Sequence, residues 1–218
     1  MRKITKVKLV KLLILLVGLC IAHLGVTLFI LSDLGTDPFN VLIQGIFRTQ
    51  DNLLEFSFLT HGRVHMMICF AIILVLLMVE KTYVKIGTII CMFCGGPIID
   101  IFTFLLRNVL NANSSYGFRV LGIVSGCIIL AFGMTIVIKS DSGTGPNDLV
   151  AVVISDKLKK KFSIIRILVD GLFVFVGFLL GGSVGIGTII CVGIVGPVAG
   201  IFLPLNEKAV EFILKKVC

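Results

Sequence analysis

Long runs without a charged side chain are the feature that most restricts how this chain can fold. Residues 171–206 form 36 consecutive positions with no Asp, Glu, Lys or Arg, and residues 12–32 form another such run. About 20 apolar helical residues cross the hydrocarbon core of a bilayer. Only 15% of the residues are charged, against about 25% in an ordinary soluble domain. We therefore predict an all-α, polytopic helical membrane protein whose main partner is the lipid bilayer. A soluble enzyme is excluded, and direct nucleic-acid binding is not expected.

Six apolar segments are long enough to be transmembrane spans, and two shorter segments are not. Glycines between residues 181 and 187 mark a hairpin that divides the longest run. Proline suits a first helical turn, so short helices are expected to begin at Pro38 and Pro146. The expected spans are residues 12–31, 64–79, 86–106, 120–138, 167–181 and 186–204, and the short membrane-associated helices are residues 38–47 and 146–156. Residues 205–218 are expected to form a cytoplasmic amphipathic tail.

The basic residues predict the orientation but leave the number of crossings open. If the short helices do not cross, six crossings put 16 of the 20 Lys and Arg residues on one side; if both cross, eight crossings put 17 there. Cytoplasmic segments of membrane proteins are rich in these residues. Both arrangements therefore place the N-terminus, residues 157–161 and the C-terminus in the cytoplasm. The first apolar run is interpreted as a retained span rather than a cleaved signal peptide.

An internal repeat divides the chain into two halves. Residues 25–42 match residues 133–150 at eight of 18 positions, with an offset of 108. Residues 85–102 match residues 185–202 at ten of 18 positions, with an offset of 100. Shared hydrophobicity does not place Asp, Thr, Pro and Gly at matching positions, so we predict a duplication. The first repeat is expected over residues 1–110 and the second over residues 118–206. The halves would be parallel if the short helices cross and inverted if they do not.

The repeated motif resembles a known family. The pattern Asp-x-Gly-x-x-Pro, a short helix, then Gly-Thr and Gly-Pro is similar to the YczE/YyaS/YitT family of bacterial membrane proteins, and most similar to its YczE branch. The resemblance covers residues 9–204. In that branch the first break usually reads Gly-Pro-Trp-Asp, where this chain has residues 37–40 as Asp-Pro-Phe-Asn. The second usually reads Gly-Pro-Arg-Asp, where residues 145–148 are Gly-Pro-Asn-Asp. The resemblance implies a multi-pass protein of the bacterial inner membrane and no catalytic residues.

Polar residues gather where each short helix begins. A helix N-terminus carries about half a positive charge and free N–H groups, so one Asp or Thr there is an ordinary cap. Each break holds about four polar residues, more than capping requires, which also permits a binding pocket for a small polar solute. The candidate binding residues of the second break are Asp141, Thr144, Asn147 and Asp148, and those of the first are Asp37 and Asn40, beside Asp33 and Thr36.

Three ionisable residues inside apolar segments complete the candidate binding site. Arg166 and Asp170 are four residues apart and therefore face the same side of a helix. They form either a structural ion pair or part of a pathway, since intramembrane charges commonly mark one or the other. The first half retains Arg63 but has Met67 where Asp170 would be. Asp100 follows Pro97 in an apolar helix and is either a proton or cation site or an acid bonded to a neighbouring helix.

These patterns favour a permease-like carrier for a small polar or ionisable solute, with its site at the interface of the repeats. The alternative is a membrane accessory protein that acts on a cytoplasmic protein partner through residues 157–161 and the tail. No metal or cofactor is expected, and no enzymatic activity, since no catalytic motif or ATP-binding motif is present. The second break is predicted to be the more important, because Asp148 and Asp170 are carboxylates where the first half has Asn40 and Met67.

Overall fold

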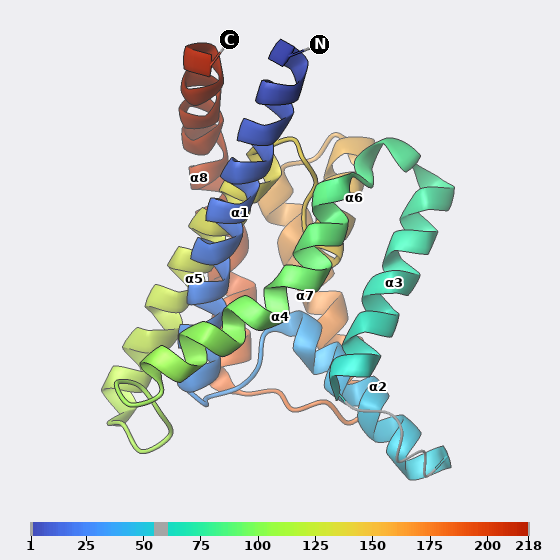
Figure 1. Cartoon of the computed structure of the whole chain (residues 1–218). Helices are drawn as coiled ribbons and strands as arrows, with labels where there is room; N and C mark the ends of the chain where they lie inside the picture. Colours follow the sequence, from blue (N-terminus) through green and yellow to red (C-terminus); the bar gives the residue numbers. More distant parts are fainter. Residues whose placement is uncertain (1, 55–60, 218) are drawn as a thin grey trace.

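The computed structural model describes residues 2–54 and 61–217, and all regular structure within these ranges is helical. This confirms the predicted all-α class. Figure 1 shows the helices arranged as a bundle, with both chain termini at the same end. The helices are α1 (Arg2–Leu31), α2 (Pro38–Leu54), α3 (His61–Val79), the 3-10 turn η1 (Lys81–Tyr83), α4 (Ile86–Leu106), α5 (Tyr116–Lys139), α6 (Pro146–Leu158), α7 (Phe162–Leu179) and α8 (Ile186–Val217).

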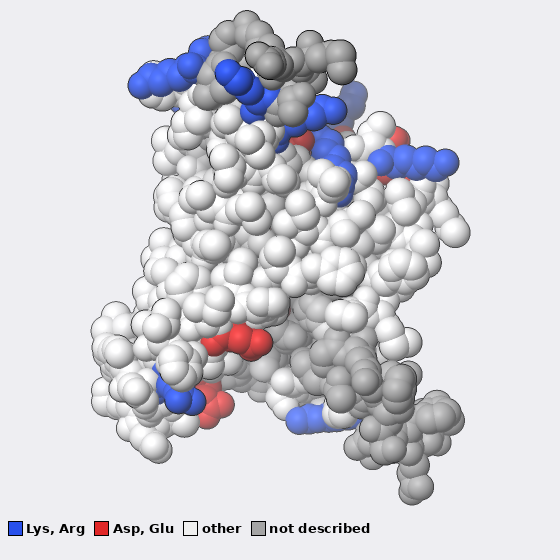
Figure 2. Space-filling model, in the orientation of Figure 1, with Lys and Arg blue, Asp and Glu red and all other residues white. Residues whose placement is uncertain are grey.

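The sides of the bundle are apolar. Figure 2 shows a broad uncharged surface between two ends that carry charged residues. Large apolar side chains are exposed, among them Ile86, Leu121 and Ile189 at 70%, 67% and 67%. So much exposed apolar surface is stable against lipid but not against water. Among the described residues, α1, α4, α5, α7 and α8 are long and apolar enough to cross a membrane, and the apolar part of α3, Val64–Val79, is shorter. The chain is an integral membrane protein that crosses the bilayer several times.

Helices α1 and α5 pack closely because glycines face each other across the contact. A Cβ atom on Gly25 would lie 2.4 Å from the backbone nitrogen of Leu130 and 2.5 Å from the carbonyl oxygen of Gly126. A Cβ atom on Gly133 would lie 2.7 Å from the carbonyl oxygen of Gly18. Small residues allow helix backbones to approach this closely in membranes. On its other side α5 packs against α8, where Cys127, Ala131, Met134, Cys191, Val195 and Ala199 belong to one buried cluster.

Two irregular segments interrupt the helices, one before α2 and one before α6. Asp33 and Asp141 have left-handed backbones, with φ of 47° and 57°, and Gly35 and Gly143 have φ of 137° and 128°. At Gly35 and Gly143 these angles favour glycine, because other residues rarely adopt them. The two segments therefore share the same local backbone conformation.

Each irregular segment is bonded to the start of a helix from the other half of the chain. The amide of Gly187 in α8 donates to the carbonyl oxygen of Leu34 at 2.9 Å. The amide of Gly87 in α4 donates to the carbonyl oxygen of Ser142, also at 2.9 Å. These bonds satisfy backbone groups that would otherwise be unpaired in the bundle interior.

Helices α2 and α6 run from the irregular segments toward opposite ends of the bundle. Near the end of α2, the Arg48 guanidinium donates to the carbonyl oxygen of Gly181, in the connection between α7 and α8. Near the end of α6, Asp156 accepts a hydrogen bond of 3.0 Å from the hydroxyl of Tyr83 in η1. The connection that contains η1 lies at the same end as the two termini (Figure 1).

Some helix boundaries differ from those expected. Helix α2 continues to Leu54, beyond residue 47, and α6 continues to Leu158, beyond residue 156. The segment expected as a tail, residues 205–218, continues α8, which runs without interruption to Val217 although Pro197 and Pro204 lie inside it. The Asn206 amide donates to the hydroxyl of Thr135 at 2.6 Å. This bond holds the segment after Pro204 against α5, and the helix continues in the same direction.

Candidate functional site

Arg166 joins two carboxylates from different helices in the interior of the bundle. Its Nε donates to Oδ2 of Asp170 at 2.8 Å, and its Nη1 donates to Oδ1 of Asp148 at 2.5 Å. The side chains of Arg166, Asp148 and Asp170 are 8%, 17% and 1% exposed. We call these three residues the Arg166 cluster. Oδ1 of Asp170 is buried and accepts no hydrogen bond from any described residue.

Local sequence places each member of the Arg166 cluster. Arg166 and Asp170 lie one turn apart on the buried face of α7, beside Ile165 and Val169. Asp148 lies in the first turn of α6, which begins at Pro146. The free N–H groups at a helix start stabilise a carboxylate there. The irregular segment before α6 therefore directs an acidic first turn toward the basic residue on α7.

The remaining polar residues of the short-helix starts bond mainly to one another. Asn147 donates from Nδ2 to Oδ1 of Asp148 at 3.1 Å. Asp37 caps α2: its Oδ1 accepts the backbone N–H of Asn40 at 3.2 Å, and its Oδ2 accepts the Asn40 side-chain amide at 2.5 Å. Both Asp37 and Asp148 interact electrostatically with Asp170. The starts of α2 and α6 thus both contribute a negative charge to the surroundings of Asp170.

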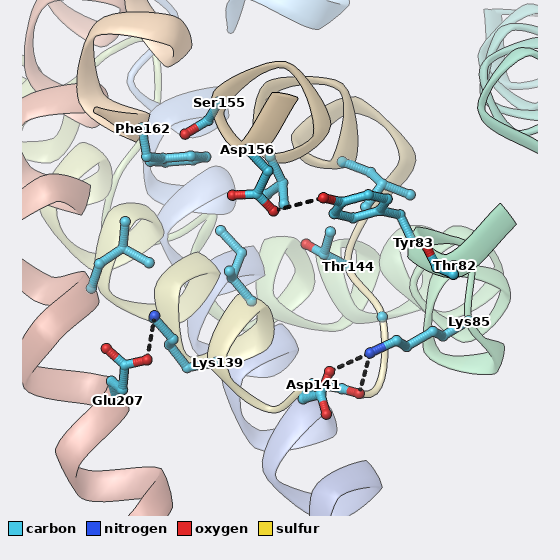
Figure 3. Close-up of a pocket in the computed structure, with 15 residues that line it drawn as sticks. Thr82, Tyr83, Lys85, Lys139, Asp141, Thr144, Ser155, Asp156, Phe162 and Glu207 are labelled. Carbon is cyan, nitrogen blue, oxygen red and sulfur yellow. Dashed lines mark hydrogen bonds and ion pairs between the residues drawn. The ribbon is translucent and has the colours of Figure 1, made fainter. Parts of the chain in front are cut away.

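A recess of about 530 Å³ lies between η1, the end of α5, α6 and α8. It is at the end of the bundle that carries the termini. Figure 3 shows its polar side chains, including the Tyr83–Asp156 and Lys139–Glu207 pairs on its walls. Thr144 lines it and has a buried hydroxyl oxygen without a partner among the described residues. Thr144 lies four residues before Asp148, and Leu149, which directly follows Asp148, also lines the recess, so the recess approaches the Arg166 cluster from one end of the bundle.

Asp141 lies on the rim of this recess and belongs to a separate group of charges. It accepts hydrogen bonds from Nζ of Lys11, at 2.7 Å, and from Nζ of Lys85. The side-chain hydrogen bonds from Lys11 and then Lys85 lower the pKa of Asp141 below its usual range. Its side chain is 60% exposed, so these pairs fasten α1 and α4 to the irregular segment at a solvated surface.

The structure brings together some of the predicted site residues and separates others. Asn147, Asp148, Arg166 and Asp170 form one group, Asp37 and Asn40 lie at the start of α2, and Asp141 and Thr144 line the recess. Asp100 lies on an exposed face of α4, outside the Arg166 cluster.

Sequence reasoning missed the contact between Asp148 and Arg166 and the role of Lys11. Lys11 aligns with Arg119 at the same offset of 108 that relates the two irregular segments. Arg119 in turn donates to the backbone of Ser32 and forms an ion pair with Asp33 at 3.6 Å. Extending the alignment to Lys11 and Arg119 would have shown a basic residue shared by the two halves, while the contacts of both with the irregular segments are visible only in the structure.

Comparisons with known proteins agree with the resemblance inferred from the motif. The uncharacterized protein YyaS of Bacillus subtilis is 29% identical over 192 residues, which are 88% of this chain and 92% of that protein. An uncharacterized protein of Haemophilus influenzae is 29% identical over 196 residues, 89% of this chain and 84% of its own. The uncharacterized membrane protein YczE of Bacillus subtilis is 24% identical over 200 residues, 91% of this chain and 88% of its own. No solved structure matches the chain.

These relatives confirm the predicted membership of the YczE/YyaS group. The model of one protein family matches residues 9–204, which include both irregular segments, the Arg166 cluster and nearly all of the recess. The chain belongs to this family, DUF6198, a family of unknown function.

Proposed function

We propose that the protein is a membrane carrier for a small polar or ionisable solute, with the Arg166 cluster as its binding site. The observation that carries this proposal is the buried Oδ1 of Asp170, which has no partner in the described part of the chain and lies beside a guanidinium and a second carboxylate. Charged side chains inside a membrane are costly, and they commonly mark a pathway for an ion or solute. A purely structural ion pair between Arg166 and Asp170 would need neither Asp148 nor an open carboxylate oxygen.

The architecture supports a carrier built from two inverted repeats. In this proposal α1, α3, α4, α5, α7 and α8 cross the membrane, while α2 and α6 enter from opposite sides without crossing. The matching backbone angles at Asp33 and Asp141 and the exchanged bonds of Gly87 and Gly187 are the expected result of a two-fold relation between the halves. Carriers of this kind bind their solutes beside broken helices at the repeat interface.

The two sides of the proposed site are packed differently. At the end with the termini, the recess approaches Thr144 at the start of α6. At the opposite end α2 lies directly against α7, because a Cβ atom on Gly45 would lie 2.4 Å from the carbonyl oxygen of Gly177. A Cβ atom on Gly182 would lie 2.3 Å from the carbonyl oxygen of Val41. This difference supports a state in which the site is accessible from one side only, as a carrier requires.

Topology reporters test the orientation on which this proposal depends. We expect a reporter fused at Cys218 and another inserted after Thr82 to give cytoplasmic signals, and one inserted at Ser183 to give an external signal. The reason is that the basic end of the bundle, which carries the termini, should face the cytoplasm. An external signal after Thr82 would contradict six crossings and favour eight, and reversal of all three signals would contradict the orientation.

Substitutions in the Arg166 cluster test the carrier itself. Asp148→Asn and Asp170→Asn should each lower activity at least about tenfold, because removing one partner of a buried charge pair typically costs 2–5 kcal/mol. Met67→Ala, at the position that aligns with Asp170 and with a side chain 56% exposed, is the matched control and should have little effect. Asn40→Ala, the counterpart of Asp148, should have a smaller effect than Asp148→Asn.

The measurement is complementation of a deletion strain, with the amount of each variant in the membrane determined in parallel. Full activity of both Asp variants at normal membrane levels would contradict the proposal. If activity instead disappeared on replacing the lysines at positions 157 and 159–161 by glutamine, a second candidate function would be favoured over the carrier. That candidate is an accessory protein acting on a cytoplasmic partner, and the basic connection between α6 and α7 is the feature in its favour.

A further inference from the structure

The described charged groups around Arg166 carry more negative than positive charge. Arg166 pairs with both Asp148 and Asp170, and Asp37 adds a third carboxylate near enough to act electrostatically on Asp170. The N-termini of α2 and α6 each contribute about half a positive charge. Counted over these described groups alone, three carboxylates, one guanidinium and two helix ends leave about one negative charge without compensation.

The excess negative charge lies beside a carboxylate oxygen that accepts no hydrogen bond from the described residues. Oδ2 of Asp170 accepts from Nε of Arg166, but its Oδ1 has no partner among the described residues, and the side chain is 1% exposed. Burying a charged oxygen without a partner is costly, because the lost hydration is not replaced. Oδ1 is therefore the atom where an additional positive group would be stabilised most.

Among the described groups that act electrostatically on Asp170, the cation is Arg166. Arg166 lies on the same helix, Asp148 on α6, Asp37 on α2, and the thiol of Cys191 on α8 also interacts with Asp170. The groups in electrostatic contact with Asp148 from α1, α3 and α4 are His23, Cys69 and Cys91. Lys11 and Lys85 are bonded to Asp141 on the rim of the recess, and Lys139 is bonded to Glu207.

We propose that Oδ1 of Asp170 binds one removable positive charge, so that the solute of the carrier, or the ion that moves with it, is a proton or a monovalent cation. The physiological meaning of this inference rests on the proposed carrier function, but the binding step does not. When a proton is the occupant, it forms an O–H bond at Oδ1 and leaves to water on release. When a metal ion or an ammonium group is the occupant, it displaces that proton.

Infrared difference spectroscopy of the purified protein in liposomes tests the proposal without a transport assay. The probes are pH, sodium chloride, potassium chloride and methylammonium chloride, with N-methylglucamine chloride at the same ionic strength as the reference. A protonated carboxyl group gives a C=O stretching band that a carboxylate lacks. We expect such a band to disappear either at alkaline pH or on addition of one of the cations, and to be missing in Asp170→Asn.

Asp100→Asn is the matched control, because Asp100 lies in an apolar helix but on its exposed face. This variant should retain the response of the wild-type protein. If Asp170→Asn does not fold, Asp37→Asn replaces it. Removing that charge eliminates most of the negative excess, so the cation concentration or acidity needed to produce the band change should rise at least about tenfold.

The outcomes of this experiment either identify the occupant of Oδ1 or overturn the proposal. A band that responds to pH but to no cation identifies the proton as the occupant, and loss of the band on addition of methylammonium, sodium or potassium identifies that class of cation. A spectrum that changes with neither pH nor any cation overturns the proposal, whether the band is always present or always absent. A normal spectral response combined with full activity of Asp148→Asn and Asp170→Asn in complementation would overturn the carrier function and leave this site standing.

Discussion

Replacing Arg166 by methionine is expected to destabilise the folded protein by about 3–5 kcal/mol, the usual cost of removing one partner from a buried ion pair. Methionine retains an unbranched apolar stem but removes the charge that compensates Asp148 and Asp170. Both carboxylates would then lie 17% exposed or less with no guanidinium to bond them. Thermal unfolding of the purified protein in detergent, together with its yield from membranes, measures this loss.

Two further variants separate the charge from the side-chain packing. Arg107→Met removes an arginine that lies over the ring of Phe104 at the exposed end of α4, and it should change stability by less than about 1 kcal/mol. Adding Asp148→Asn and Asp170→Asn to Arg166→Met removes the uncompensated negative charges, so stability should recover while activity stays absent. If the triple variant is no more stable than Arg166→Met alone, charge compensation is not the reason for the loss.

Replacing Gly25 by valine is expected to disrupt the contact between α1 and α5. The first added carbon atom would lie 2.4 Å from the backbone nitrogen of Leu130 and 2.5 Å from the carbonyl oxygen of Gly126. These atoms are backbone and move only if the whole helix moves. Overpacking of this kind typically costs 1–3 kcal/mol and sometimes more, and we expect the upper part of that range. The melting temperature in detergent should fall accordingly.

Gly193 provides the matched control, because a Cβ atom there would meet nothing within 4 Å. Gly193→Ala should be neutral or stabilising by about 0.5–1 kcal/mol, since alanine is the better helix former. Gly25→Ala should already be destabilising despite the same gain in helix propensity. If both alanine variants were equally stable, the close approach of α1 and α5 would not contribute to the stability of the fold.

The helices were predictable where residues within the segment itself determine the helix. Runs of uncharged residues indicated the long helices, and Pro38 and Pro146 correctly marked the first residues of α2 and α6. Their ends were less predictable, because α2 continues to Leu54 through polar residues that do not interrupt a helix. The last span was expected to end at residue 204, where the tail begins. Instead α8 continues, and Asn206 donates a hydrogen bond to Thr135 of α5. No local sequence pattern reveals this contact between two helices.

The candidate site was predictable only in part. The spacing of Arg166 and Asp170 correctly indicated that they face the same side, because helical geometry alone determines this. Nothing in the spacing indicated that Asp148, on another helix, would share the same guanidinium. Asp100 was selected by the same argument as Asp170, yet it lies on an exposed face of its helix. In a helix that is apolar on all sides, the sequence does not indicate which face turns inward.

By itself the sequence determined that this chain folds in a membrane, that it is helical, and where its helices are interrupted. Hydrophobicity acts on each segment separately, and glycine and proline act on the backbone where they stand, so these properties do not depend on neighbouring helices. Only the tertiary structure decided which polar groups meet: Arg166 with Asp148, Lys11 with Asp141, and Asn206 with Thr135. Such contacts depend on how each helix is rotated and how closely it packs, and packing of small residues such as Gly25 and Gly133 determines both.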